Sequence, residues 1–116
     1  MEAIKDQELK EMLEELSGLL RQVYGDRLKS IILYGSVARG TQTEGSDIDI
    51  MVLIDGDEAE LRKYTDQLND VSTDMSLKYI KVFSIMDVSY QEYIDWEQIS
   101  PFYKNVSREG VLLYAA

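Results

Sequence analysis

The sequence predicts an α/β (α+β) fold in which helices pack against a small mixed β-sheet. Three observations predict it: apolar residues recur at helical spacing near the N-terminus, two short apolar runs flank a polar loop, and further helix start signals surround a third run. With 116 residues, 45% of them hydrophobic, the chain has the size of one globular domain. We therefore expect a single domain over residues 1–116.

The first quarter of the chain predicts a helix followed by a strand. Apolar residues recur every three or four positions over residues 4–24, and Gly25 is placed to end that helix. Leu28–Tyr34 is rich in isoleucine and leucine, which indicates a buried strand. Residues 37–46 contain two glycines, two threonines and a serine, so we expect a loop with one helical turn near Ala38.

The second strand is expected at residues 47–54. Alternation along it places Asp47, Asp49, Met51 and Leu53 on one face and the four intervening residues on the other. Both faces are apolar beyond the acidic start, which is typical of a central strand covered on both sides. The two aspartates then lie at the open end of the sheet.

The rest of the chain predicts helix, strand, helix and helix. We expect a helix over 57–71, a third strand over 76–88, and a short helix over 89–96 that begins with a capping box. Pro101 and Gly110 are placed to start and stop a last helix. Residues 111–114 are too short a run to classify.

Composition excludes several classes of function. The formal net charge is −10 without a basic run, so we expect no long nucleic acid as a partner. Cysteine and histidine are absent, which excludes thiol and Ser-His-Asp catalysis and leaves carboxylates with a hard cation. The N-terminus is too charged for a signal peptide and no apolar run is long enough to cross a bilayer, so we expect a cytoplasmic protein with no membrane contact.

The residues that carry chemistry lie where the first two strands flank the polar loop. Gly35-Ser36 follows one apolar run, and Asp47-x-Asp49 begins the next after ten intervening residues. A glycine turn with a hydroxyl can approach phosphates closely, and carboxylates at i and i+2 of a strand share a face. Each feature alone is more often structural; together at this spacing they favour a site for a metal-bound nucleotide triphosphate. Arg39 is a candidate for neutralising phosphate charge, although an ion pair on the surface is an equal alternative.

The pattern G-S-x10-D-x-D, with GSVARG, SDIDIMVLID and PFYKNVSREGVLLY around and after it, resembles the nucleotidyltransferase superfamily that includes DNA polymerase β, and most closely its minimal nucleotidyltransferase (MNT) branch. The resemblance implies a polymerase β-like core and a Mg2+-dependent transfer of AMP from ATP. It implies that Asp47 and Asp49 are catalytic residues and metal ligands, and that Gly35, Ser36 and Arg39 bind the nucleotide. It also implies a partner protein with a HEPN domain, whose hydroxyl accepts the AMP in a toxin–antitoxin pair.

One position departs from the family pattern. Active members commonly carry a third carboxylate on the later strand, after a tyrosine, and here Ile80 occupies the expected position. Asp74 and Asp87 are the nearest acids, but six residues of strand span about 20 Å, so neither fits without a bulge or a fold-back. We therefore expect reduced or lost catalysis, or a third ligand from water, the substrate or a partner.

Two alternatives to the enzyme stay open. The first is a binding module that keeps the fold and neutralises or scaffolds its partner by contact. Its interface would be anchored by a C-terminal group of aromatic residues: Tyr90, Tyr93, Trp96, Phe102 and Tyr103. Burial in the core is the more common role for such residues. The second is an antibiotic-modifying type of nucleotidyltransferase. Because no residues remain for an acceptor domain, that reading requires a homo-oligomer whose C-terminal helices cover the partner's aspartates.

Overall fold

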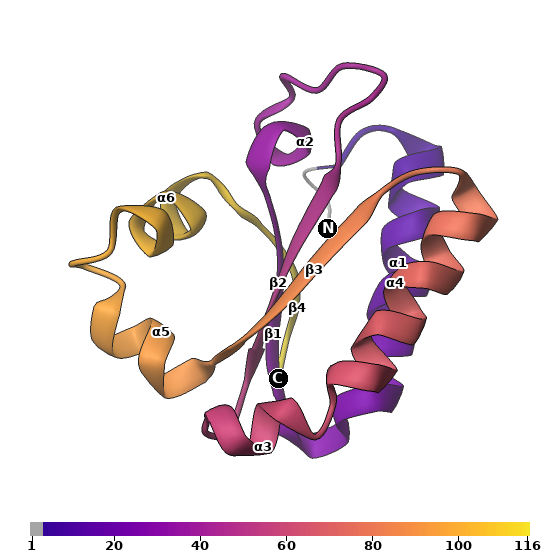
Figure 1. Cartoon of the computed structure of the whole chain (residues 1–116). Helices are drawn as coiled ribbons and strands as arrows, with labels where there is room; N and C mark the ends of the chain where they lie inside the picture. Colours follow the sequence, from indigo (N-terminus) through magenta and orange to yellow (C-terminus); the bar gives the residue numbers. More distant parts are fainter. Residues whose placement is uncertain (1–3) are drawn as a thin grey trace.

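The computed structural model describes residues 4–116 and contains a four-stranded sheet with helices on both faces (Figure 1). The elements follow in the order α1 Gln7–Tyr24, the 3-10 turn η1 Gly25–Arg27, β1 Leu28–Tyr34, α2 Gly35–Arg39, β2 Ile48–Ile54, α3 Glu58–Arg62, α4 Thr65–Tyr79, β3 Phe83–Ser89, α5 Tyr90–Trp96, α6 Pro101–Glu109 and β4 Val111–Ala115. The predicted α/β (α+β) class is confirmed.

The sheet is mixed, with the strand order β3-β2-β1-β4. β1 pairs antiparallel with β2 and β4, while β2 pairs parallel with β3. The unclassified C-terminal run is thus an edge strand beside β1. As the alternation predicted, β2 is internal and its two faces meet different layers.

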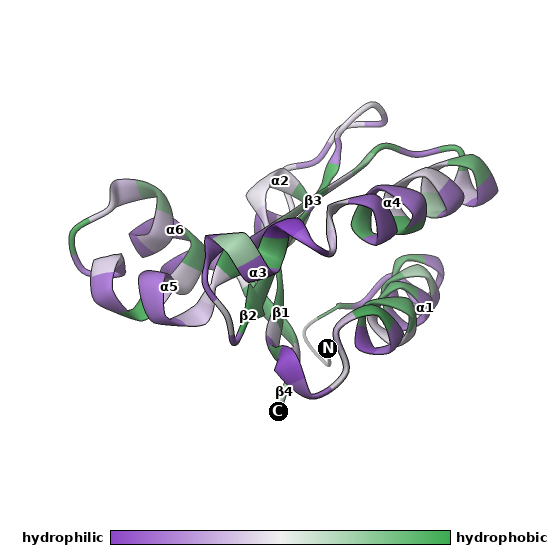
Figure 2. Cartoon of the chain, turned by 60° about the horizontal axis from the view of Figure 1, so that its bottom comes forward, coloured by the Kyte–Doolittle hydropathy of each residue, from purple (hydrophilic) through white to green (hydrophobic). Residues whose placement is uncertain are grey.

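Helices α1 and α4 cover one face of the sheet, and α5 and α6 cover the other (Figure 1). The core on the α1 and α4 side contains Ile48, Ile50, Val52 and Ile54 of β2. Met51 and Leu53 face the other way and pack with Tyr93 of α5 and Val106 of α6. Figure 2 shows the hydrophobic stripes of α1 and α4 turned toward each other and the sheet, which is how an amphipathic helix gains stability from burial.

The N-terminal helix starts later than predicted. α1 begins at Gln7 because the Asp6 carboxylate accepts a hydrogen bond from the Leu9 backbone N–H at 3.1 Å, and it ends at Gly25 as expected. Among the described residues, no helix combines the length and apolar character that crossing a bilayer requires.

The middle of the chain differs from the prediction in two places. The helix expected over 57–71 is two helices, α3 and α4, and residues 76–79, expected in a strand, form the last turn of α4. The buried side of α4 is formed by Leu68, Val71 and Met75, so helical packing outweighs the alternation of apolar residues that suggested a strand. β3 starts only at Phe83.

Ile80 ends α4 rather than standing on the strand. It has φ +54°, its N–H donates to the Ser76 carbonyl, and 85% of the residue is exposed. Glycine is the usual residue in this left-handed position and β-branched residues are rare there, so no stop signal is visible at the end of this helix. The prediction that Ile80 occupies the third acidic position on the later strand is wrong.

Candidate functional site

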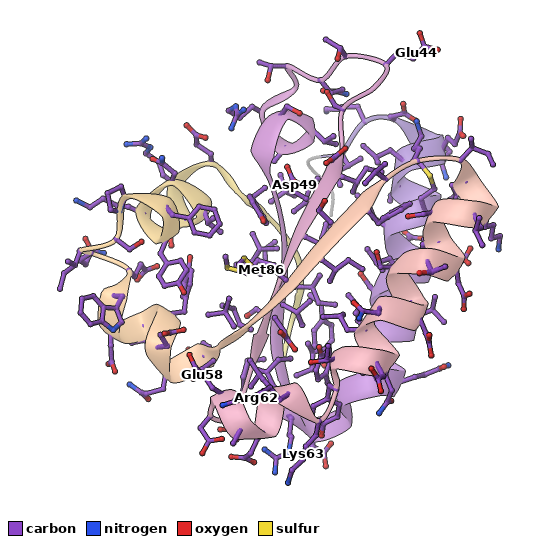
Figure 3. All side chains as sticks on the ribbon, in the orientation of Figure 1. Glu44, Asp49, Glu58, Arg62, Lys63 and Met86 are labelled. Carbon is purple, nitrogen blue, oxygen red and sulfur yellow. The ribbon has the colours of Figure 1, made fainter. Side chains whose placement is uncertain are left out.

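The glycine turn and the acidic pair lie at the same end of the sheet. Tyr34, the last residue of β1, is the register partner of Asp49 in β2, so Gly35 begins α2 directly beside that aspartate. Figure 3 shows Asp49 near the end of β2 from which the loop to α2 departs. Neighbouring strands lie about 4.8 Å apart, which brings the two sequence motifs into one place.

Gly35 is required here for two reasons. Its φ is +77°, a conformation that glycine adopts without strain. A β-carbon at this position would lie 3.2 Å from Cγ of Asp49 and closer still to Oδ2. Only a residue without a side chain allows the Asp49 carboxylate to stand against the turn.

Ser36 and the following loop are held together by hydrogen bonds. Ser36 is the second residue of α2, and its carbonyl accepts a hydrogen bond from the Thr41 backbone N–H at 3.0 Å. The loop closes through the Ser46 hydroxyl, which accepts from the Thr43 backbone N–H at 2.9 Å. These contacts hold the turn and loop together just before Asp47.

The two aspartates differ in environment. Asp47 is exposed, whereas Asp49 is half-buried. Burial is the main cause that raises the pKa of Asp49 above its ordinary value, and the negative charge of Asp47 adds to it while Arg39 opposes it. The pair is thus two like charges that a cation would neutralise.

Arg39 reaches the site only in part. Its Nη1 lies 3.4 Å from Oε2 of Glu109 in α6, an ion pair in which both side chains are partly exposed. Its charge still acts on Asp49. The structure therefore shows the ion pair that was one reading from the sequence, and the role of Arg39 in neutralising phosphate charge stays a prediction.

Ser84 is a site residue that sequence reasoning missed. It is the register partner of Asp49 across β2 and β3, and its Oγ lies 3.5 Å from Oδ2 of Asp47. Within residues 4–116, no group of three or more acidic side chains is placed to share a metal ion. The serine in KVFS (residues 81–84) is the only sequence signal for this position. It would have been recognised only if the third strand had been predicted to begin after Lys81.

The other two acids that were weighed lie elsewhere, as expected. Asp87 is on the opposite face of β3, where its Oδ2 accepts a hydrogen bond from the Tyr24 hydroxyl at 2.9 Å. That carboxylate is the second cause, after burial, of the raised pKa of Tyr24. Asp74 is exposed on α4.

The acidic pair opens to solvent. Two cavities of about 310 and 320 Å3 lie around Val37 and Leu9, between α2 and the start of α1, and neither is lined by Asp47, Asp49 or Ser36. Between β3 and the α5–α6 pair is a shallower depression of about 330 Å3, lined by Met86, Glu92, Trp96, Ser100, Phe102 and Tyr103. Met86 is two residues along β3 from Ser84 on the same face.

The C-terminal aromatic residues divide between core and surface. Tyr93 is buried, in line with a role in the core. Trp96 and Phe102 are 51% and 42% exposed, which the burial interpretation did not predict. The ring of Phe102 packs edge-on to Tyr34 with centroids 5.6 Å apart, so this aromatic surface reaches the strand that carries the glycine turn.

Comparison with known proteins shows the family of the chain. The model of the family described as nucleotidyltransferase domain matches residues 8–108. Two putative protein adenylyltransferases of Methanocaldococcus jannaschii are similar in sequence: one is 37% identical over 105 residues, 88% of this chain and 94% of its own length. The other is 40% identical over 78 residues, 61% of this chain and 76% of its own.

Solved structures show the same fold. A chain of a toxin–antitoxin crystal structure with AMP-PNP has a TM-score of 0.57 and 21% identity, over 90% of this chain and 73% of that one. A chain of the complex of tri-AMPylated Shewanella oneidensis HEPN toxin with MNT antitoxin has a TM-score of 0.53 and 18% identity, over 96% and 74%. The family match extends over most of the chain and includes the turn and both aspartates. The chain belongs to the nucleotidyltransferase domain family.

Proposed function

We propose that the chain transfers AMP from ATP, with Mg2+, to a hydroxyl of a partner protein with a HEPN domain, as the antitoxin of a toxin–antitoxin pair. The observation that carries the proposal is the contact between the Gly35 turn and the Asp49 carboxylate. It makes one surface from a backbone that phosphates can approach and a carboxylate pair that binds a hard cation.

Each predicted residue has a role at this surface. Gly35 lets the triphosphate approach the backbone, and the Ser36 hydroxyl donates a hydrogen bond to a phosphate oxygen. Arg39 neutralises phosphate charge after exchanging Glu109 for the nucleotide. Asp47 and Asp49 are the metal ligands and the catalytic residues.

The residues present fit a magnesium ion that arrives with the nucleotide. Mg2+ is usually held by one or two carboxylates together with substrate phosphates and water. Burial and the charge of Asp47 raise the pKa of Asp49, and the repulsion between the two carboxylates supports the proposal that a cation binds between them. When bound, the ion supplies charge neutralisation at the phosphates.

The transfer step is a displacement at the α-phosphorus. The acceptor oxygen forms a bond to that phosphorus, the bond to the bridging oxygen of the β-phosphate breaks, and pyrophosphate leaves. The proton of the acceptor hydroxyl passes to water. The residue opposite Asp49 is Ser84, whose neutral hydroxyl cannot accept that proton as a carboxylate would.

A protein as acceptor is supported by the open site. Asp47 is exposed and no described cavity is lined by the acidic pair, so the second molecule must supply the walls that position the hydroxyl. The names of the relatives, protein adenylyltransferases, and the tri-AMPylated HEPN toxin in a similar complex support the same class of acceptor.

The alternative is a binding module that acts by contact alone. It is favoured by the serine beside the acidic pair and by the exposed Trp96 and Phe102 on the depression between β3 and the α5–α6 pair. Aromatic side chains that are exposed in a free protein often anchor interfaces. In this reading the partner binds without being modified.

The experiment combines the chain, Mg2+, a HEPN-domain protein as the candidate partner, and ATP labelled on either the α- or the γ-phosphate. We expect label on the partner from α-labelled ATP only, and none with the Asp47→Asn, Asp49→Asn double variant. Label from γ-labelled ATP would mean phosphoryl transfer and would contradict the proposal. Tight partner binding with no label from either nucleotide would instead support the binding module.

A further inference from the structure

The pairing of β2 with β3 decides which residue stands next to the acidic pair. The strands are parallel, with Ile48 opposite Phe83 and Asp49 opposite Ser84. Ile48 and Phe83 are buried on the α1 and α4 side, so Ser84 faces the other side with Asp49. This register places Ser84 in the row that contains both aspartates.

The hydroxyl of Ser84 reaches across this row. Its Oγ lies 3.5 Å from Oδ2 of the exposed Asp47, a long contact for a hydroxyl donor. Its importance is therefore its position more than the strength of the hydrogen bond. Asp47, Asp49 and Ser84 form a triangle with a carboxylate at two corners and a neutral hydroxyl at the third.

The neutral Ser84 hydroxyl affects how many cations this group of side chains can bind. Two carboxylates neutralise one divalent cation, and the triphosphate supplies further anionic oxygens to the ion that it brings. A second ion, placed beside the acceptor oxygen and away from the outer phosphates, depends on ligands from the protein, and repulsion from the first ion makes it unfavourable without a further carboxylate. Two metals at about 3.5–4 Å from each other need carboxylates that bridge or flank both ions. The described residues offer no third acidic side chain for this purpose.

We propose that Ser84 limits the acidic pair to one divalent cation, bound together with the nucleotide, and that a carboxylate at position 84 would create a site for a second. This inference rests on the proposed nucleotide site and states its metal capacity. It also assigns the position beside the acidic pair, where a third carboxylate would stand, to Ser84. Ile80 is instead 85% exposed at the end of α4.

The test counts bound Mn2+ by electron paramagnetic resonance, with and without the nonhydrolysable analogue AMP-PNP. The variants are Ser84→Asp and Ile80→Asp, which add the same charge at the two competing positions. We expect one Mn2+ per chain for the wild type, only with AMP-PNP, and the same for Ile80→Asp. Ser84→Asp is expected to bind a second ion, because the added carboxylate supplies the missing anionic ligand.

Two outcomes would overturn the inference. One is a Ser84→Asp protein that binds Mn2+ like the wild type, and the other is an Ile80→Asp protein that gains as much as Ser84→Asp. Ser84→Ala is expected to bind within about threefold of the wild type, because the lost hydrogen bond is long. A loss of Mn2+ affinity in Ser84→Ala as large as that in Asp49→Asn would also overturn the inference, because it would mean that Ser84 acts by holding Asp47.

Folding and the underlying nucleotide site are controlled separately. Ser84→Asn has the shape of aspartate without its charge, so it shows whether the position accepts the larger side chain. If Ser84→Asn folds, the larger side chain fits, and Ser84→Asp must then fold either alone or once Mn2+ is added. A Ser84→Asp protein that stays unfolded with Mn2+ counts against the inference. Asp49→Asn tests the nucleotide site itself. If that variant binds Mn2+ and AMP-PNP like the wild type, the proposed function is rejected. If only the Ser84 variants fail to behave as expected, the inference about the number of metal ions is rejected and the proposed function is not.

Discussion

Gly35 lies so close to Asp49 that a β-carbon on the glycine would stand 3.2 Å from the carboxyl carbon of the aspartate. The two residues are fourteen positions apart in the chain and meet because Tyr34 and Asp49 are partners in the β1–β2 ladder. The contact joins the glycine turn, which we propose that phosphates approach, and the acidic pair, which we propose holds the metal, in one surface. It also makes the site sensitive to a single methyl group.

Gly35→Ala is therefore expected to abolish Mg2+-dependent ATP binding, because the added methyl group displaces the Asp49 carboxylate. Gly40→Ala is a matched control: Gly40 has φ +74°, close to the +77° of Gly35, but a β-carbon there meets no described atom within 4 Å. Both variants should lose about 1–2 kcal/mol of stability to backbone strain. Isothermal titration should show binding in Gly40→Ala alone, and equal binding in both would mean that the contact is irrelevant to the site.

Arg39 is expected to contribute to phosphate binding once it leaves Glu109. Exposed ion pairs contribute about 0–1 kcal/mol, so little opposes the exchange. Arg39→Gln should weaken ATP binding about tenfold, since hydrogen bonds to charged groups contribute about 1.5–3 kcal/mol, and should affect AMP less. Glu109→Gln should leave ATP binding unchanged or tighter; a tenfold loss there would show that the ion pair, and not the free guanidinium, supports the site.

A clamp between α1 and α4 should give the fold a specific acid sensitivity. The Tyr79 hydroxyl donates to Glu15 Oε1 at 2.6 Å and Lys78 Nζ donates to both oxygens at 2.9 and 3.0 Å. The hydrogen bond from Tyr79 is the main cause that lowers the pKa of Glu15 below 4.5, followed by the one from Lys78. A lowered pKa in the folded state contributes stability above pH 4.5 that is lost as pH falls through the lowered value.

Glu15→Gln should therefore flatten the decline of melting temperature between pH 5 and the acid range. Glu14→Gln, at an exposed position on the same helix, is the control and should keep the wild-type profile. Identical profiles in all three proteins would show that the clamp does not contribute to stability.

Ile80→Gly is expected to stabilise the protein. Ile80 has φ +54° and is 85% exposed, so glycine relieves backbone strain and removes almost no packing. Relief of about 1–2 kcal/mol, less the greater freedom of glycine in the unfolded chain, leaves about 0.5–1 kcal/mol. For a chain of this size the melting temperature should rise by about 2–4 °C. A fall in melting temperature would show that the exposed side chain packs more than its exposure indicates.

The sequence predicted those parts of the fold that have strong local signals. The stripe of α1, the alternation of β2 and the glycine turn each follow from residues close in the chain, and the structure confirms them. The end of α4 was missed because it is marked by an isoleucine in a conformation that glycine usually adopts.

The same error affected the residue expected beside the acidic pair, which the family pattern after Tyr79 had assigned to Ile80. A strand that begins at residue 76 puts Ile80 near the aspartates, whereas the observed start at Phe83 puts Ser84 there. β2 and β3 are parallel and are connected through α3 and α4, so no tight turn determines their register. The pairing of Arg39 with Glu109, seventy residues later, is likewise a tertiary contact.

The most direct measurement is Mg2+-dependent ATP binding, by isothermal titration, in the wild type, Asp47→Asn and Asp49→Asn. We expect wild-type binding to require Mg2+ and each variant to lose it while keeping its fold. The Asp49→Asn protein should melt at the same or a higher temperature, because burial and Asp47 disfavour the ionised carboxylate in the folded state. Equal ATP binding in the three proteins, or binding by the wild type that ignores Mg2+, would contradict the central claim that the turn and the acidic pair hold a cation-bridged triphosphate.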